Sequence, residues 1–258
     1  MAGCGPRPHS DRIFRQPPCG RPFLAANGPL LEREMESAIH IRAVEARQGW
    51  RWIADGYQLF RQQKLAWVLM GIAYLAITLL LSMLPLAGQV LLGVSAPLFT
   101  AGYLLATAKQ RRGETIKVSD LFLGWQQHLQ PLAGYCLLLL PITLAGGLIA
   151  EHIVESSGAR HQLLVFGEVL LWLFSIACMF IVPLITFSQA TLWPALRLSV
   201  GGVQRNWGPL LVYFLAILLL AMLSVFTLGL ALLVLIPVVY ISLFMAWRDI
   251  FAGDVDLR

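Results

Sequence analysis

Long apolar runs separated by short polar segments make up most of this chain from residue 65 onward. A helix rises about 1.5 Å per residue, so about 20 apolar residues are needed to cross the hydrocarbon core of a bilayer. Six runs are that long or nearly so, over residues 65–84, 86–108, 131–150, 163–187, 209–226 and 228–247. The last two form one uncharged stretch, which we divide near 224–229 because it is about twice the length of one span. The pattern predicts an all-α polytopic membrane protein, a six-transmembrane-helix bundle; the alternative is five spans with one long tilted helix.

Residues 49–64, directly before the first run, have a different periodicity. At about 100° per residue, the aromatic side chains of this segment fall on one half of a helix and most of its charged side chains on the other. A helix of this kind lies in the membrane interface, with Trp and Tyr at headgroup depth and Arg and Lys at the phosphates. We therefore predict an N-terminal amphipathic interfacial helix; a plain stop-transfer flank is the alternative. The predicted lipid contacts are Trp50, Trp52, Tyr57, Arg51, Arg61 and Lys64.

The pattern also suggests how the rest of the chain is organised. Residues 1–34 contain six prolines and no helical period, which predicts a disordered N-terminal extension. Met35 stands just before the patterned part, so we expect this extension to be dispensable or absent from the native protein. Residues 35–64 form the cytosolic or interfacial amphipathic segment, 65–252 the six-helix transmembrane domain, and 253–258 a cytosolic tail.

Charge gives the orientation. Only 13% of the residues are charged, against about 25% in a soluble domain. There are 19 Lys and Arg residues, and with six spans all of them except Arg160 fall on one side. Loops rich in Lys and Arg stay in the cytosol, so both termini are predicted to be cytosolic. Because the basic residues lie beside apolar spans, the net charge of +5 favours anionic lipid headgroups as partners and argues against nucleic acid.

Glu168 is the strongest single candidate for a site, because it is the one charged residue within a predicted span. An ionisable side chain in a membrane often marks a ligand or proton path. The alternative is that Glu168 lies at headgroup level near Arg160 or His161. Prolines inside four of the spans predict kinks, which broken transporter helices and ordinary membrane helices share; they are Pro97, Pro141, Pro183 and Pro237.

Motifs for catalysis are missing from the sequence. It has no HExxH, no Walker loop and no GxSxG, and its five His residues form no ligand pattern with Cys. We therefore expect no catalytic residue, no metal, no cofactor and no enzymatic activity.

Two stretches of the chain resemble each other. In each, a Pro-Leu pair inside a span is followed by a basic segment, a Trp, and a second Pro-Leu that opens the next span. The matched Trp residues are Trp125 and Trp207, and the second pairs begin at Pro131 and Pro209. Short helices are expected over 118–129 and 195–206. The pattern is consistent with a parallel internal repeat or with two convergent hairpins.

The stretch IRAVEARQGWRWIADGYQLF, with RRGE, DLFLGW, WPALRLSV and NWGPLL after it, resembles a family of uncharacterised proteobacterial inner-membrane proteins. This family is distantly similar to the membrane domain of some glycerophosphodiester phosphodiesterases. The resemblance covers residues 39–252 and implies a fold and a location in the bacterial inner membrane. The phosphodiesterase chemistry belongs to a separate domain that this sequence lacks.

These observations favour a non-enzymatic integral inner-membrane protein of the scaffold or envelope-homeostasis type. The alternative is a small transporter or permease-like protein for a hydrophobic or lipidic solute. Expected partners are membrane lipids with anionic headgroups, and further copies of the chain or other membrane proteins.

Overall fold

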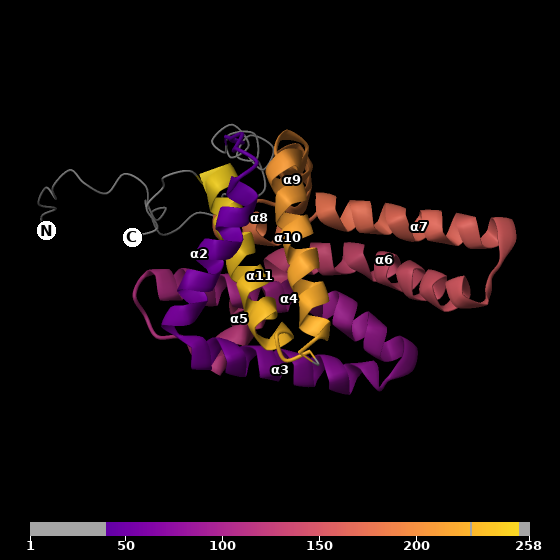
Figure 1. Ribbon diagram of the computed structural model, residues 1–258, viewed down its shortest axis with the longest axis horizontal. Helices are drawn as coiled ribbons and strands as arrows, with labels where there is room; N and C mark the ends of the chain where they lie inside the picture. Colours follow the sequence, from indigo (N-terminus) through magenta and orange to yellow (C-terminus); the bar gives the residue numbers. More distant parts are fainter. Residues whose placement is uncertain (1–39, 228, 253–258) are drawn as a thin grey trace, which may run out of the picture.

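The computed structural model describes residues 40–227 and 229–252, and every regular element in these ranges is a helix. The predicted extension 1–34 and tail 253–258 lie outside the described residues. The longer helices, shown in Figure 1, are α2 (Gln48–Gln62), α3 (Lys64–Ser82), α4 (Pro85–Arg111), α6 (Leu129–Glu155), α7 (Gly158–Ala177), α8 (Ile181–Ser188), α9 (Leu192–Arg205), α10 (Trp207–Val225) and α11 (Leu232–Trp247). A 3-10 helix (Val118–Phe122) leads into α5 (Leu123–Gln127), and a π-helix (Arg248–Ala252) follows α11.

Six helical segments of the described chain are long and apolar enough to cross a membrane, as the sequence predicts. The fourth span consists of two helices, α7 and α8, separated by a short turn. The long uncharged stretch near the end divides into α10 and α11, as predicted. Gly229 lies in the turn between them with φ 82°, a backbone conformation that a residue with a Cβ rarely adopts.

The six spans alternate between outer and inner positions. In the outer helices α3, α6 and α10, 17%, 17% and 28% of the most apolar stretch is buried, against 56% in the inner helices α4 and α11. The fourth span is 44% buried, and its buried residues belong to α8 and the turn before it, whereas the described residues of α7 are all partly or fully exposed. Each inner helix contains one of the predicted prolines, Pro97, Pro183 or Pro237. The inner helices α4, α8 and α11 therefore form the centre of the domain, while α3, α6, α7 and α10 keep most of their surface exposed.

A short helix precedes each outer helix, and we call α2, α5 and α9 the collar helices. A single polar residue separates each collar helix from the outer helix after it: Gln63, His128 and Asn206. These residues share φ near −125° (−133°, −126° and −121°), and the carbonyl oxygen of each accepts the N–H of the residue four positions later. We call Gln63, His128 and Asn206 the break residues. The order of collar helix, break residue, outer helix and then the span that contains an inner helix thus occurs three times.

Only two of these three units were predicted from the sequence. Pro131 and Pro209 do occupy matching places, three residues after His128 and Asn206. The match of Trp125 with Trp207 is wrong, because Trp125 lies inside α5 whereas Trp207 begins α10.

Each collar helix packs on the inner helix of the preceding unit, and α2 packs on α11 of the last unit, so the three units close into a ring. Figure 1 shows α2 running alongside α11. The backbones approach closely at glycines: a Cβ at Gly56 would lie 3.2 Å from the carbonyl oxygen of Val238. A Cβ at Gly124 would overlap the carbonyl oxygen of Leu98 in α4.

Candidate functional site

The apolar face of α2 is covered by protein. Trp52 is fully buried and its indole packs edge-on against Tyr213 of α10, with ring centroids 6.0 Å apart. The prediction that Trp52 contacts lipid is therefore wrong: the helical period identified the apolar face of α2 but not whether lipid or protein covers it. Trp50 and Tyr57 are 56% and 47% exposed, and lipid contact by these two side chains stays a prediction.

The basic residues predicted to reach lipid phosphates lie on the outer surface. Arg51, Arg61 and Lys64 are all exposed. They share that surface with Asp55, which is also exposed. The outward face of α2 therefore carries charges of both signs, and lipid contact by these residues stays a prediction.

Polar contacts join the two ends of the described chain. Oδ2 of Asp249, beyond α11, accepts hydrogen bonds from Trp52 Nε1 at 2.9 Å and from Gln48 Nε2 at 2.7 Å. The N–H of Arg42 donates to the carbonyl oxygen of Ile250 at 2.8 Å. The segment before the first span is thus fixed to the segment after the last one.

Two of the break residues bind the chain segment that leads into a collar helix. The amide oxygen of Asn206 accepts the N–H of Val44 at 2.8 Å, and its amide nitrogen donates to the carbonyl oxygen of Arg42 at 2.9 Å. Gln63 repeats this geometry on the segment before α5, where it accepts from the N–H of Ile116 and donates to the carbonyl oxygen of Glu114. These amide pairs link the third unit to the first and the first unit to the second.

The second unit has His128 where the other two have an amide side chain. His128 lies just before the span that begins at Leu129. Burial of the imidazole lowers the pKa of His128 below its ordinary value, because a partly dehydrated site disfavours the charged form.

The break between α7 and α8 is the clearest irregularity within a span. Pro183 has no N–H, and its ring crowds the carbonyl group four residues earlier, so the helix cannot run through this point unchanged. The fully buried Ser199 of α9 fills the gap. Its Oγ donates to the carbonyl oxygen of Ala177 at 2.6 Å and accepts the N–H of Phe180 at 3.2 Å. One side chain therefore satisfies backbone groups on both sides of the break.

Glu168 lies in the middle of α7, ten residues after its first residue. At about 1.5 Å per residue this is about 15 Å from the start of the helix, and whether Glu168 lies at headgroup level or deeper stays a prediction. The side chain is partly buried, and Oε2 is enclosed without a hydrogen-bond partner. Neighbouring α7 residues contact α6: a Cβ at Gly167 would lie 3.5 Å from the Ile149 side chain.

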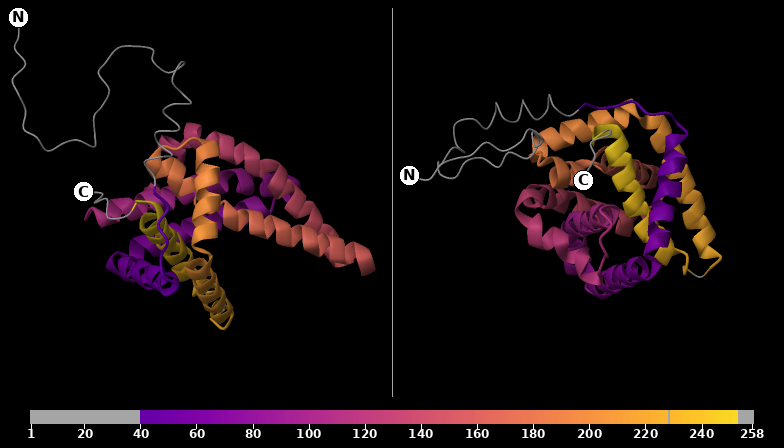
Figure 2. Two further views of the ribbon diagram at one scale, coloured as in Figure 1. Left: turned by 90° about the horizontal axis from the view of Figure 1, so that it is seen from above. Right: turned by 90° about the vertical axis from the view of Figure 1, so that its left-hand side faces the viewer.

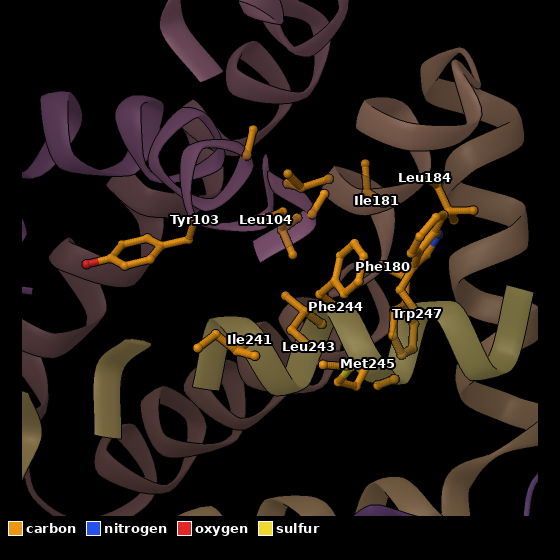
Figure 3. Close-up of a cluster of buried hydrophobic side chains, with 14 of the residues drawn as sticks. Tyr103, Leu104, Phe180, Ile181, Leu184, Ile241, Leu243, Phe244, Met245 and Trp247 are labelled. Atoms are coloured by element: carbon orange, nitrogen blue, oxygen red, sulfur yellow. The ribbon is translucent and has the colours of Figure 1, made fainter. Parts of the chain in front are cut away.

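Apolar side chains fill the centre of the domain, where the inner helices meet. Figure 3 shows the side chains of α4, α8 and α11 and of the turn before α8 converging there. The members that are completely buried are Leu104, Phe180, Ile181, Leu184, Ile241 and Phe244. The hydroxyl of Tyr103 points away from this cluster and is buried without a hydrogen-bond partner.

In the part of the chain that the structure describes, no three His, Cys, Asp or Glu side chains come together in a way that holds a metal ion. Cys136 and Cys178 are buried free thiols. The expected absence of catalysis and cofactors stays a prediction.

Sequence reasoning missed Ser199, Asn206 and Asp249, whose roles depend on contacts with distant segments. A weak signal exists for Ser199, since Ala195, Ser199 and Gly202 form a stripe of small residues on one face of α9. Comparison of the chain with protein-family models, curated proteins and solved structures found no match.

Proposed function

We propose that this chain is a non-enzymatic protein of the bacterial inner membrane, of the scaffold or envelope-homeostasis type, with both termini in the cytosol. The observation that carries the proposal is the closed apolar centre between α4, α8 and α11. A transporter needs polar groups around a solute path near the middle of the membrane. Fully buried Phe180 and Phe244 help to fill the space between α4, α8 and α11 instead, which supports a packed interior.

The ring of units supports a rigid framework. The collar helices, the break-residue amides and the contacts of Asp249 tie each unit to its neighbour at one end of the domain. Such an arrangement holds three surface helices at fixed positions, which suits a protein that positions partners. The resemblance to proteobacterial inner-membrane proteins supports the location.

A flux assay on reconstituted protein tests the proposal. The full chain is incorporated into liposomes, and the movement of a fluorescent phospholipid between leaflets is compared with that in empty liposomes. We expect equal rates. Acceleration by the wild-type chain, abolished by Glu168→Gln and retained by Ser175→Ala, would refute the scaffold proposal. Ser175 is a fair control because its exposed hydroxyl bonds only to Leu171 of its own helix.

Transport of a hydrophobic or lipidic solute is the second candidate, and Glu168 is the observation that favours it. A carboxyl group within a span, with one enclosed and unpartnered oxygen, is costly to bury unless a ligand binds it. In this proposal the solute moves along the surface of the α6–α7 hairpin instead of through the centre. The flux assay with Glu168→Gln separates the two candidates, since only transport depends on that side chain.

A further inference from the structure

The carboxyl group of Glu168 lies on the α6–α7 hairpin without a positive charge close to it. Its Oε2 is enclosed and has no hydrogen-bond partner, and Glu168 forms no ion pair in the part of the chain that the structure describes. Arg160 lies about two helical turns before it on α7. The imidazoles of His152 and His161 bond to other groups near the turn of the hairpin. A carboxylate in apolar surroundings is stabilised by a nearby cation, so a positively charged ligand suits this place.

The hairpin extends away from the rest of the domain, so one side of α7 is open. Figure 1 and the left-hand view of Figure 2 show α6 and α7 reaching away from α2. Among the described helices, α7 packs on α6 and, to a lesser extent, on α9. A Cβ at Gly167 would lie 3.5 Å from the Ile149 side chain, and one at Gly146 would lie 3.6 Å from the Leu171 side chain, so Gly167 and Leu171 face α6. Glu168 lies beside them at the edge of this contact, which agrees with its partial burial.

An exposed indole lies one helical turn after this carboxyl group. Trp172 is 66% exposed and follows Glu168 by four residues on the same helix, so their Cβ atoms are about 5–6 Å apart. Val165 and Val169 flank the pair and are 39% and 48% exposed. Indole faces attract organic cations, quaternary ammonium ions above all. The outer edge of α7 thus presents a negative charge, an aromatic face and aliphatic side chains together.

We propose that Glu168 and Trp172 form a binding site for a lipophilic cation, a quaternary ammonium or phosphonium ion with apolar substituents. The charge of the ligand faces the carboxylate, while its substituents lie on the indole and the aliphatic side chains of α7. A neutral lipid would leave the carboxylate unopposed, and an inorganic cation gains little from the apolar surface. The site does not depend on whether the protein acts as a scaffold or as a transporter. If the second candidate function holds, the solute that moves along the hairpin is a cation of this class.

Equilibrium dialysis of the full chain in detergent against tetraphenylphosphonium tests this site. Tetraphenylborate, an anion of the same size and shape, is the matched ligand and should bind much more weakly. Glu168→Gln should weaken tetraphenylphosphonium binding about ten-fold or more, because an opposite unit charge near a protein surface contributes that much. Glu168→Asp keeps the charge and should retain most of the binding. Trp172→Leu should weaken binding about two- to five-fold, the equivalent of one exposed cation–π contact.

Two variants away from the hairpin are the matched controls. Glu114→Gln removes a carboxylate that already pairs with Arg112, so it changes the formal charge of the chain by the same amount as Glu168→Gln. Trp193→Leu removes an indole of similar exposure, 67%, from α9. Both controls should bind tetraphenylphosphonium like the wild type. Thermal unfolding of every variant is measured alongside, and Glu168→Asp with Trp172→Leu carries the test if Glu168→Gln does not fold.

Three results would overturn the proposal. They are equal binding of the two ions by the wild type, equal tetraphenylphosphonium binding by the hairpin variants and their controls, and displacement of the ligand by sodium chloride at matching concentration. The last result would indicate a site for an inorganic cation. Binding in detergent needs no movement across a bilayer, so this test is separate from the flux assay. Absence of flux leaves the site in place, and absence of binding leaves the scaffold proposal in place.

Discussion

Replacing Ser199 by Ala tests whether one hydroxyl group holds the broken fourth span together. The substitution removes both hydrogen bonds across the α7–α8 break and leaves the Phe180 N–H and the Ala177 carbonyl oxygen without that partner. Ser199 is fully buried, so water cannot take its place without a rearrangement. An unsatisfied buried donor or acceptor costs about 1–3 kcal/mol. Because the carbonyl group tolerates the loss better than the N–H, we expect a loss of about 2–4 kcal/mol in the free energy of unfolding.

Titration with SDS in mixed micelles, followed by circular dichroism, measures this loss. Ser175→Ala is the matched control on α7, because it removes an exposed hydroxyl whose bond stays within its own helix. It should change the free energy of unfolding by less than about 0.5 kcal/mol. Equal unfolding midpoints for the two variants would refute the assigned role of Ser199.

A double-mutant cycle with Pro183→Ala tests the cause of the break. Alanine supplies the N–H that proline lacks and removes the ring that crowds the preceding turn. The helix is then free to satisfy its own backbone groups, so Ser199→Ala should cost less in that background. Residues that share a network show coupling energies of about 0.5–3 kcal/mol. Strict additivity would mean that Pro183 does not cause the break.

Three further predictions concern contacts of the collar helices, the break residues and the 3-10 helix before α5. Gly102→Ala should destabilise the fold by about 1–3 kcal/mol, because the new Cβ overlaps the carbonyl oxygen of Leu121. In the same SDS titration Gly134→Ala should be nearly neutral, because its Cβ would make an ordinary 3.5 Å contact with the Leu192 side chain. Asn206→Ala releases residues 42–44, so limited proteolysis should cut there faster than in wild type; unchanged cleavage would contradict the assigned contact. Burial lowers the pKa of His128 in the folded state, so the unfolded chain takes up its proton first as pH falls below about 6.5, and stability should decline there. Thermal unfolding at pH 7.5 and 5.5 should show this decline in wild type and a smaller one in His128→Asn.

The spans could be predicted from sequence because their signal is local. A run of about 20 apolar residues has few ways to satisfy its backbone except as a membrane helix, so the six spans are found near their predicted positions. The prolines show where this reasoning ends. Pro97, Pro141 and Pro237 lie inside continuous helices, whereas Pro183 accompanies a break. The sequence of the span does not contain the reason, because the hydroxyl that fills the gap belongs to Ser199 in α9.

The candidate sites were harder to predict for a related reason. Trp50 and Trp52 are two residues apart on one amphipathic helix, yet Trp50 is exposed and Trp52 is buried against α10 and bonded to Asp249. The helical period shows which half of a helix is apolar, but it does not show whether protein or lipid covers that half. For Glu168, the apolar run around it predicts its place in a span, but no local pattern predicts that Oε2 is buried without a hydrogen-bond partner.

The contacts between the two ends of the domain decide the number of crossings. Trp52, which precedes the first span, bonds to Asp249, which follows the last, and Arg42 bonds to Ile250. Both segments therefore lie on the same side of the membrane, and the number of crossings is even, which excludes five spans. With six spans, the sequence predicts that every Lys and Arg except Arg160 falls on that side, and the retention of basic loops predicts that it faces the cytosol. Cysteine labelling of residues 109–117 from outside the cell would contradict the orientation but not the crossing number, because the latter depends on hydrogen bonds within the protein.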